Sequence, residues 1–165
     1  MAMVAFYLAD KSITSHTMEQ EILNLVAWES DHGYKIDVTT AEVVEILDAF
    51  YGVTARIVRD PSAADITRLL SEGNLVIIPA AGRELGNPYF HQPGPIYHML
   101  VIRGYEAGEF ITNDPGTKRG EAYRYPFATL MNAIHDWDHQ RADGGMTDEE
   151  MSQGLRRIVV VPLEQ

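Results

Sequence analysis

A histidine and an aspartate stand at the ends of two neighbouring apolar segments. His98 begins the first segment and Asp114 follows the second. An imidazole held by a carboxylate is the base and orienting pair of a nucleophilic triad. Residues 97–102 and 109–112 read as strands, and 105–108 supply a turn. In such a hairpin the residue numbers of two positions that face each other add up to a constant, here about 212–215. His98 therefore lies opposite a residue near 114–117. We therefore expect His98 and Asp114 to lie within hydrogen-bonding reach at one end of a sheet.

Both residues also have a purely structural interpretation. A histidine before an apolar strand is often only a strand-terminal residue. An aspartate before Pro115-Gly116 is often a turn former, because its side chain bonds nearby backbone N–H groups. On this interpretation the chain is an α+β domain without a triad.

The other elements that must position this pair follow from periodicity and capping. Thr39 and Glu42 form a capping box for a helix over 40–50, while Thr17 with Gln20 predicts a second box. Asp60-Pro61 predicts another helix start. Residues 1–9 are apolar at every helical position, which predicts a helix buried on all sides. Expected helices are 1–9, 17–30, 40–50, 61–72 and 127–137, and expected strands are 53–58, 74–78, 97–103, 109–112, 121–125 and 156–161. The fold class is α+β, with helices packed on a mainly antiparallel sheet.

Two motifs give this chain a family resemblance. The run HMLVIRGY over 98–105 and the run FITNDPG over 110–116 resemble the His and Asp motifs of the peptidase C39-like family, a branch of the papain-like cysteine peptidases. Residues 1–9 resemble the family's first helix, and 123–137 resemble its aromatic segment. The resemblance implies one papain-like domain over 1–165. It also implies that His98 and Asp114 are catalytic in Cys-His-Asp hydrolysis of a peptide or amide bond.

The sequence departs from the family at the nucleophile. The family places a cysteine at the start of the first helix, a few residues before an Ala-Met pair. Ala2-Met3 is such a pair, but the 165 residues contain no cysteine, and the oxyanion-hole residue expected further upstream is also absent. One hypothesis is a peptidase domain with an incomplete N-terminus, whose first helix starts beside His98. The alternative is a catalytically inactive module that binds peptides in the old cleft. The first helix has no N-cap, which favours the incomplete domain.

Composition restricts the partners. The net charge of −11 argues against nucleic acid and anionic membranes, because both would be repelled. No apolar stretch is long enough to span a membrane, and residues 1–9 lack the basic start of a signal peptide. We expect a peptide or protein substrate, no nucleic acid, no membrane insertion and no cofactor. The compartment and the oligomeric state do not follow from the sequence.

Two further segments attract attention. His135 and His139 have the i, i+4 spacing of a helical zinc site, and Asp136 and Asp138 lie between them. No glutamate stands between the histidines, so we interpret this motif as a solvated helix end and expect no metal. Residues 79–96 are rich in proline and glycine and lead directly to His98. They predict a long ordered loop that either walls the site or makes a surface excursion.

Overall fold

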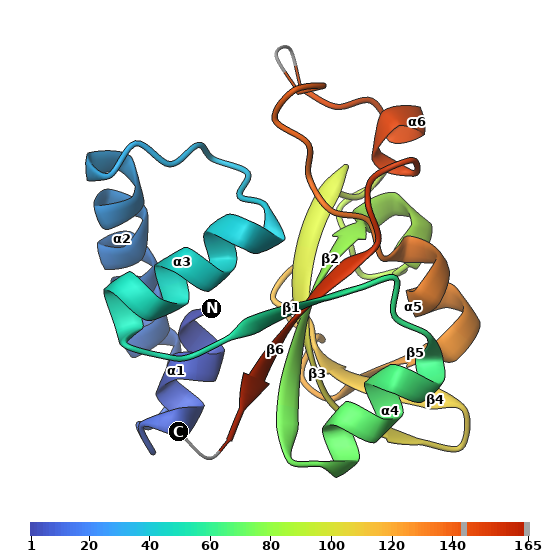
Figure 1. Cartoon of the computed structure of the whole chain (residues 1–165), viewed down its shortest axis with the longest axis horizontal. Coiled ribbons are helices and arrows are strands. Elements are labelled where there is room, and N and C mark those ends of the chain that lie inside the picture. The colour runs from blue at the N-terminus through green and yellow to red at the C-terminus, as the bar shows by residue number, and fades with distance from the viewer. Residues whose placement is uncertain (143–144, 164–165) are drawn as a thin grey trace.

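One antiparallel sheet with helices on both faces forms the molecule. The computed structural model describes residues 1–142 and 145–163. Within these residues the sheet has six strands in the order β1-β6-β2-β3-β4-β5, and every pairing is antiparallel. The strands are β1 (Arg56–Arg59), β2 (Asn74–Ala81), β3 (Tyr97–Glu106), β4 (Glu109–Asn113), β5 (Tyr123–Pro126) and β6 (Arg157–Pro162). The predicted α+β class is confirmed (Figure 1).

Three helices lie on one side of the sheet. They are α1 (Ala2–Leu8), α2 (Ser15–Asp31) and α3 (Thr40–Tyr51), and α2 packs against the other two. Val4 of α1 and Ile46 of α3 pack with Ile77 of β2 and Val159 of β6 in one buried cluster. The capping box of Thr39 and Glu42 starts α3 as predicted.

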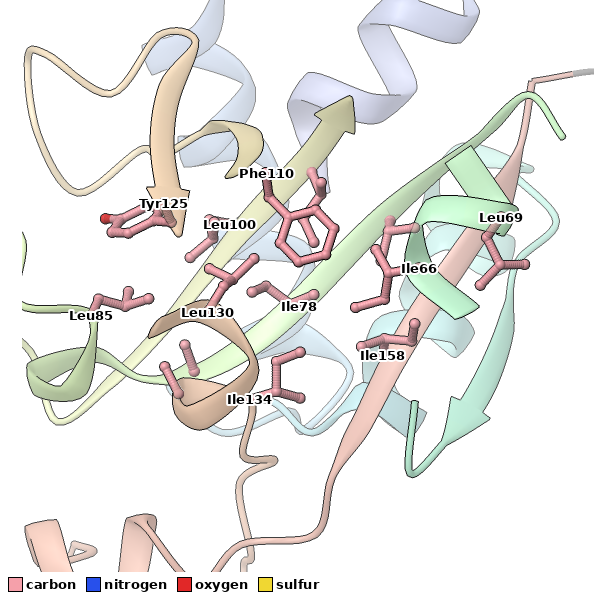
Figure 2. Close-up of a cluster of buried hydrophobic side chains, with 14 of the residues drawn as sticks. Ile66, Leu69, Ile78, Leu85, Leu100, Phe110, Tyr125, Leu130, Ile134 and Ile158 are labelled. Carbon is pink, nitrogen blue, oxygen red and sulfur yellow. The ribbon is translucent and has the colours of Figure 1, made fainter. Parts of the chain in front are cut away.

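Two helices cover the opposite face. These are α4 (Ala63–Ser71) and α5 (Phe127–Ala133). Alternation along the strands supplies this second core, because Ile78 and Leu100 point away from the first cluster and pack with Ile66 and Leu130 (Figure 2). Each central strand is therefore apolar on both faces, which explains its near-continuous hydrophobic sequence.

Several predicted boundaries are wrong for local reasons. The box that starts α2 pairs Thr14 with Thr17, because the Thr17 side chain reaches back to the N-cap. The N-cap of α4 is Ser62, which pairs with Asp65. Residues 1–9 are not buried on all sides, since Tyr7 is 61% exposed.

The proline-rich segment is also more regular than predicted. Strand β2 runs through Pro79 to Ala81 and pairs with β3 over that length, whereas β6 pairs with β2 only as far as Ile77. Pro79 thus lies where β6 no longer needs an N–H donor. A short 3-10 helix, η1 (Gly82–Leu85), follows.

The predicted helix over 127–137 is shorter. It ends at Ala133, and Ile134 instead bridges to Ala80 of β2. The last helix, α6 (Asp148–Met151), opens on a capping box of Thr147 and Glu150. Met151, the last residue of α6, is buried in a cluster with Ala81 of β2, so this polar stretch is anchored to the domain.

Candidate active site

The β3–β4 hairpin sets the separation of His98 and Asp114. Its turn is shorter than predicted, because Ala107 and Gly108 alone make it, with φ of 50° and 84°. Near the turn, Glu106 pairs with Glu109, and beyond a register shift next to Arg103, Val101 pairs with Asn113. A one-residue irregularity of this kind changes which residues oppose each other. The register carries the end of β4 alongside His98, at the start of β3.

The predicted contact is present. His98 Nε2 lies 2.7 Å from Oδ1 of Asp114, and the Asp114 side chain is fully buried. The same Oδ1 accepts a hydrogen bond from the backbone N–H of Gly116 at 2.9 Å. Since Nε2 faces a carboxylate, this nitrogen is the donor, and Nδ1 of the neutral ring is the proton acceptor. The catalytic role of both residues remains a prediction.

Two residues that sequence reasoning missed hold the other carboxylate oxygen. The Tyr125 hydroxyl donates to Asp114 Oδ2 at 2.7 Å. The Asn87 side-chain amide lies 2.7 Å from the Tyr125 oxygen and 3.4 Å from Oδ2. Tyr125 could have been suspected, as an aromatic residue in the strand after the Asp motif. Nothing in the local sequence marks Asn87, which comes from the proline-rich segment.

The electrostatics of this group favour a charged Asp114. Burial works against the carboxylate, but hydrogen bonds from His98, Tyr125 and Gly116 outweigh it and hold the pKa of Asp114 below its usual value. Burial, together with the neighbouring Asp114, raises the pKa of Tyr125. The Tyr125 hydroxyl therefore keeps its proton and donates a hydrogen bond to a carboxylate that stays ionised.

Two further residues enclose the imidazole. The Phe90 ring meets the His98 ring edge to face at 5.3 Å. A Cβ on Gly116 would lie 2.8 Å from Phe90 Cε1 and 2.9 Å from His98 Cε1. Any side chain at position 116 would therefore displace the Phe90 ring and the His98 ring. The segment 79–96 thus contributes Asn87 and Phe90 to the site.

Helix α1 approaches His98 less directly than predicted. Met1 and Val4 pack in the same cluster as Met99, the residue after His98. Alternation along β3 turns the His98 ring to the other face, where its neighbour Phe90 belongs to the second cluster. Helix α1 therefore packs on the opposite face of the sheet from the imidazole.

The histidine-rich motif after α5 is neither a helical zinc site nor a solvated helix end. His135 Nδ1 bonds the Gly154 carbonyl oxygen at 2.9 Å, whereas His139 Nε2 lies 2.9 Å from a Glu42 oxygen. The two rings face different partners because the helix ends before them. In the described part of the chain, no three His, Cys, Asp or Glu side chains form a group that could hold a metal.

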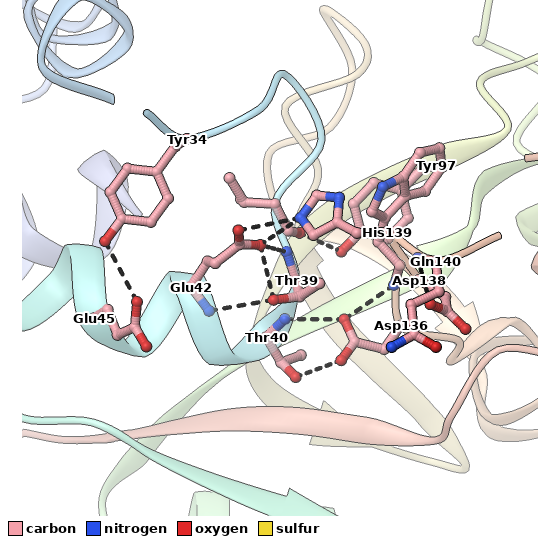
Figure 3. A network of polar contacts seen from close by, with 12 residues as sticks. Tyr34, Thr39, Thr40, Glu42, Glu45, Tyr97, Asp136, Asp138, His139 and Gln140 are labelled. Carbon is pink, nitrogen blue, oxygen red and sulfur yellow. Dashed lines mark hydrogen bonds and ion pairs between the residues drawn. The ribbon is translucent and has the colours of Figure 1, made fainter. Parts of the chain in front are cut away.

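The centre of that motif is a buried structural carboxylate (Figure 3). Asp136 accepts from the Thr40 backbone N–H at 2.9 Å and from the Thr40 hydroxyl at 2.6 Å. Burial raises its pKa, although the Thr40 hydrogen bonds and Arg157 oppose that shift. Asp136 thus ties the start of α3 to the segment after α5.

The fold and the pair of His98 and Asp114, called the dyad below, define the class of this protein as an α+β domain with a histidine on one strand, β3, and an aspartate directly after the adjacent strand, β4. A Bacillus anthracis structure provisionally described as a C39-like peptidase is similar in fold, with a TM-score of 0.50 and 12% identity. The match covers 75% of this chain and 58% of that one. The Peptidase_C39 like family matches residues 1–143, and the chain belongs to that family. No curated protein matches it.

None of the helices in 1–142 and 145–163 combines the length and the apolar character needed to cross a bilayer.

Proposed function

We propose that His98 and Asp114 are the base and the orienting carboxylate of a Cys-His-Asp centre that hydrolyses peptide or amide bonds. The observation that carries the proposal is the 2.7 Å contact between His98 Nε2 and buried Asp114. Membership of the Peptidase_C39 like family supports it. The thiol would come from outside these 165 residues, which contain no cysteine.

In this scheme each nitrogen of His98 has its own task. Nδ1 takes the thiol proton, and the thiolate attacks the carbonyl carbon of the scissile bond. The imidazolium then returns the proton to the leaving amine, and water hydrolyses the thioester. Asp114 fixes the tautomer and stabilises the charged ring, with Tyr125 and Gly116 holding the carboxylate in place. A thiol carried by the α1 side of the sheet would have to reach Nδ1 around the start of β3.

A catalytically inactive peptide-binding module is the second candidate. The absence of cysteine favours it. The two candidates differ in a direct way, because only the first requires a reactive thiol beside His98.

The in-frame codons upstream of Met1 supply the first test. A cysteine a few residues before Ala2-Met3 supports the peptidase, and its absence favours the binding module. The protein extended to include that cysteine should cleave peptides, and iodoacetamide should abolish the activity. The 165-residue chain alone should show no thiol-peptidase activity.

Variants of the extended protein test the roles. His98→Ala should lower kcat/KM by at least about 10³-fold, since base and ion-pair partner are both lost. Asp114→Asn should cost less, because the amide still contacts the ring but cannot stabilise its charge. His16→Ala, on exposed α2, is the control and should leave activity unchanged. An extended and folded protein whose cysteine does not react with iodoacetamide would contradict the peptidase assignment.

A further inference from the structure

A line of aromatic contacts joins the dyad to an exposed arginine. The Tyr125 ring, whose hydroxyl bonds Asp114, packs against Tyr123 at 4.7 Å between centroids. Tyr123 meets Tyr89 edge to face at 6.1 Å. The Arg119 guanidinium lies 4.6 Å above the Tyr89 ring, a distance at which a cation and an aromatic face attract. These contacts restrict where the Arg119 charge can lie.

Both segments that form this contact, 89–90 and 116–119, also border the His98 ring. Tyr89 adjoins Phe90, whose ring contacts His98. Arg119 is three residues after Gly116, whose backbone abuts the His98 and Phe90 rings. Gly116, Tyr89 and Arg119 are all exposed, so a bound substrate can touch this border, which consists of Gly116 against the His98 ring and Arg119 against the Tyr89 ring.

The charge of this border differs from that of the whole chain. The net charge is −11, yet among the described residues no carboxylate lies within ion-pair distance of Arg119 or of its neighbour Lys118. At physiological salt, charges more than about 8 Å away are largely screened. A substrate carboxylate at this border therefore meets two cations that no described carboxylate neutralises by a direct ion pair, and the nearest carboxylate in the sequence is Glu121.

We infer that Arg119, held over Tyr89, forms a subsite beside His98 that recognises a carboxylate of the bound peptide. The inference rests on the proposed function, since it names the substrate class of the same site. The carboxylate belongs to an Asp or Glu side chain close to the scissile bond or to a free peptide C-terminus. Cation–π contact with Tyr89 orients the guanidinium, and Lys118 adds positive charge at the same border.

The test uses the cysteine-free chain, because binding needs no nucleophile. ¹⁵N-labelled protein is titrated with the blocked pentapeptides Ac-Ala-Ala-Glu-Ala-Ala-NH₂ and Ac-Ala-Ala-Gln-Ala-Ala-NH₂, and with the Gln peptide carrying a free C-terminus. Shifts of the Arg119 Nε–H and the Gly116 amide report the site. The Glu peptide or the free-acid peptide should bind about two- to fivefold more tightly than the blocked Gln peptide at low salt. This ratio should approach one in 0.5 M NaCl.

Variants separate the subsite from general charge. Arg119→Gln should abolish the preference. Arg59→Gln, on β1 at the other edge of the sheet, should retain it. Tyr89→Phe keeps an aromatic face under the guanidinium and should preserve the ratio, whereas Tyr89→Leu should reduce it.

Three results would overturn the inference. These are equal affinities for all three peptides, no shift at Gly116 and Arg119 up to millimolar peptide, or a preference that survives Arg119→Gln. Failure of the peptidase proposal is seen separately, as absent turnover in the thiol-containing protein. A protein that cleaves peptides without any carboxylate preference would reject the subsite alone.

Discussion

Asp114 is the residue on which the geometry of the site depends. Its two oxygens accept from His98, Gly116 and Tyr125, so the carboxylate cannot rotate without breaking several hydrogen bonds. Backbone contacts reinforce this arrangement, because the Asp114 N–H donates to the Gly120 carbonyl oxygen at 2.9 Å. A Cβ on Gly120 would lie 1.7 Å from the Asp114 carbonyl oxygen, so only glycine fits there.

The lowered pKa of Asp114 predicts how stability depends on pH. A carboxyl whose folded pKa lies below its ordinary 3.8 stabilises the fold above that pH, and this contribution is lost as pH falls through the folded pKa. At pH 5 we expect the free energy of unfolding of the wild type to exceed that of Asp114→Asn by about 1.5–3 kcal/mol, because a hydrogen bond to a charged group contributes this much to stability. Urea unfolding from pH 5 to 2.5 should show this gap shrinking below pH 3.8. A gap that is constant or grows on acidification would contradict the assigned shift.

Gly116→Ala tests how closely the backbone approaches the imidazole. The new methyl would lie under 3.0 Å from atoms of the Phe90 and His98 rings, so the rings must move. We expect a loss of about 1–3 kcal/mol in unfolding free energy and a changed imidazole spectrum of His98 by NMR. Gly104→Ala is the control, since its Cβ would lie 3.8 Å from Ile111 Cδ1 and should cost little. An unchanged His98 spectrum in Gly116→Ala would refute the close approach.

At the scale of elements, the start of α3 depends on a residue far away in sequence. The first N–H groups of a helix have no partner within the helix. Thr39 and Glu42 satisfy part of this need locally, and Asp136 accepts the N–H of Thr40 from the other side of the domain. Its negative charge at the helix N-terminus also complements the helix dipole. Helix α3 and the segment after α5 therefore form one structural unit.

Asp136→Ala should separate these two elements. It leaves the Thr40 N–H, the Thr40 hydroxyl and the Trp137 N–H without their acceptor. Because the Asp136 site is buried, we expect a loss of about 2–3 kcal/mol in the free energy of unfolding. Asp138→Ala removes a carboxylate that is 41% exposed and paired with Arg141, and should cost under about 1 kcal/mol. Equal losses from both variants in urea unfolding would argue against the anchoring role.

At the scale of the whole molecule, two cores flank a shared sheet. Strands β2, β3 and β6 contribute side chains to both cores. A substitution that shifts one of these strands in one core therefore also disturbs the packing of the other core. Helix α2 is the least integrated long element. Of its 17 residues only Leu25 is buried, and Ile22, Leu23 and Val26 are exposed.

Hydrogen exchange should reveal this difference in burial. Amides of α2 should exchange faster than those of α3, which buries Thr40, Val43, Ile46 and Leu47, because local opening of α2 exposes little apolar surface. Amides of β2 and β6 should be the slowest. Exchange by NMR or mass spectrometry measures all of these regions in one sample. Equal protection of α2 and α3 would contradict the prediction.

The sequence by itself was sufficient for the two strands of the β3–β4 hairpin and for the contact between His98 and Asp114. These depend on local rules: apolar runs make strands, a short turn joins them, and the turn limits the register. The capping box at Thr39 was predictable for the same reason, since its partners are three residues apart. The predicted N-caps Thr17 and Asp60 are wrong because a second residue nearby is an equally suitable N-cap. Thr14 and Ser62 are the N-caps in the structure.

Only the tertiary structure decided which residues support the dyad. Asn87, Phe90 and Tyr125 come from segments outside the β3–β4 hairpin, and they contact the pair because the strands and the proline-rich segment fold together. The tertiary structure likewise turned Asp136 from a candidate ligand into the acceptor of the Thr40 N–H. Contacts between residues so far apart in the sequence depend on how the whole chain folds, and local sequence patterns do not determine them. The face of β3 that carries His98 was decided in the same way, since Met99 packs against the cluster on the α1 and α3 side and the imidazole of the preceding residue faces the other side.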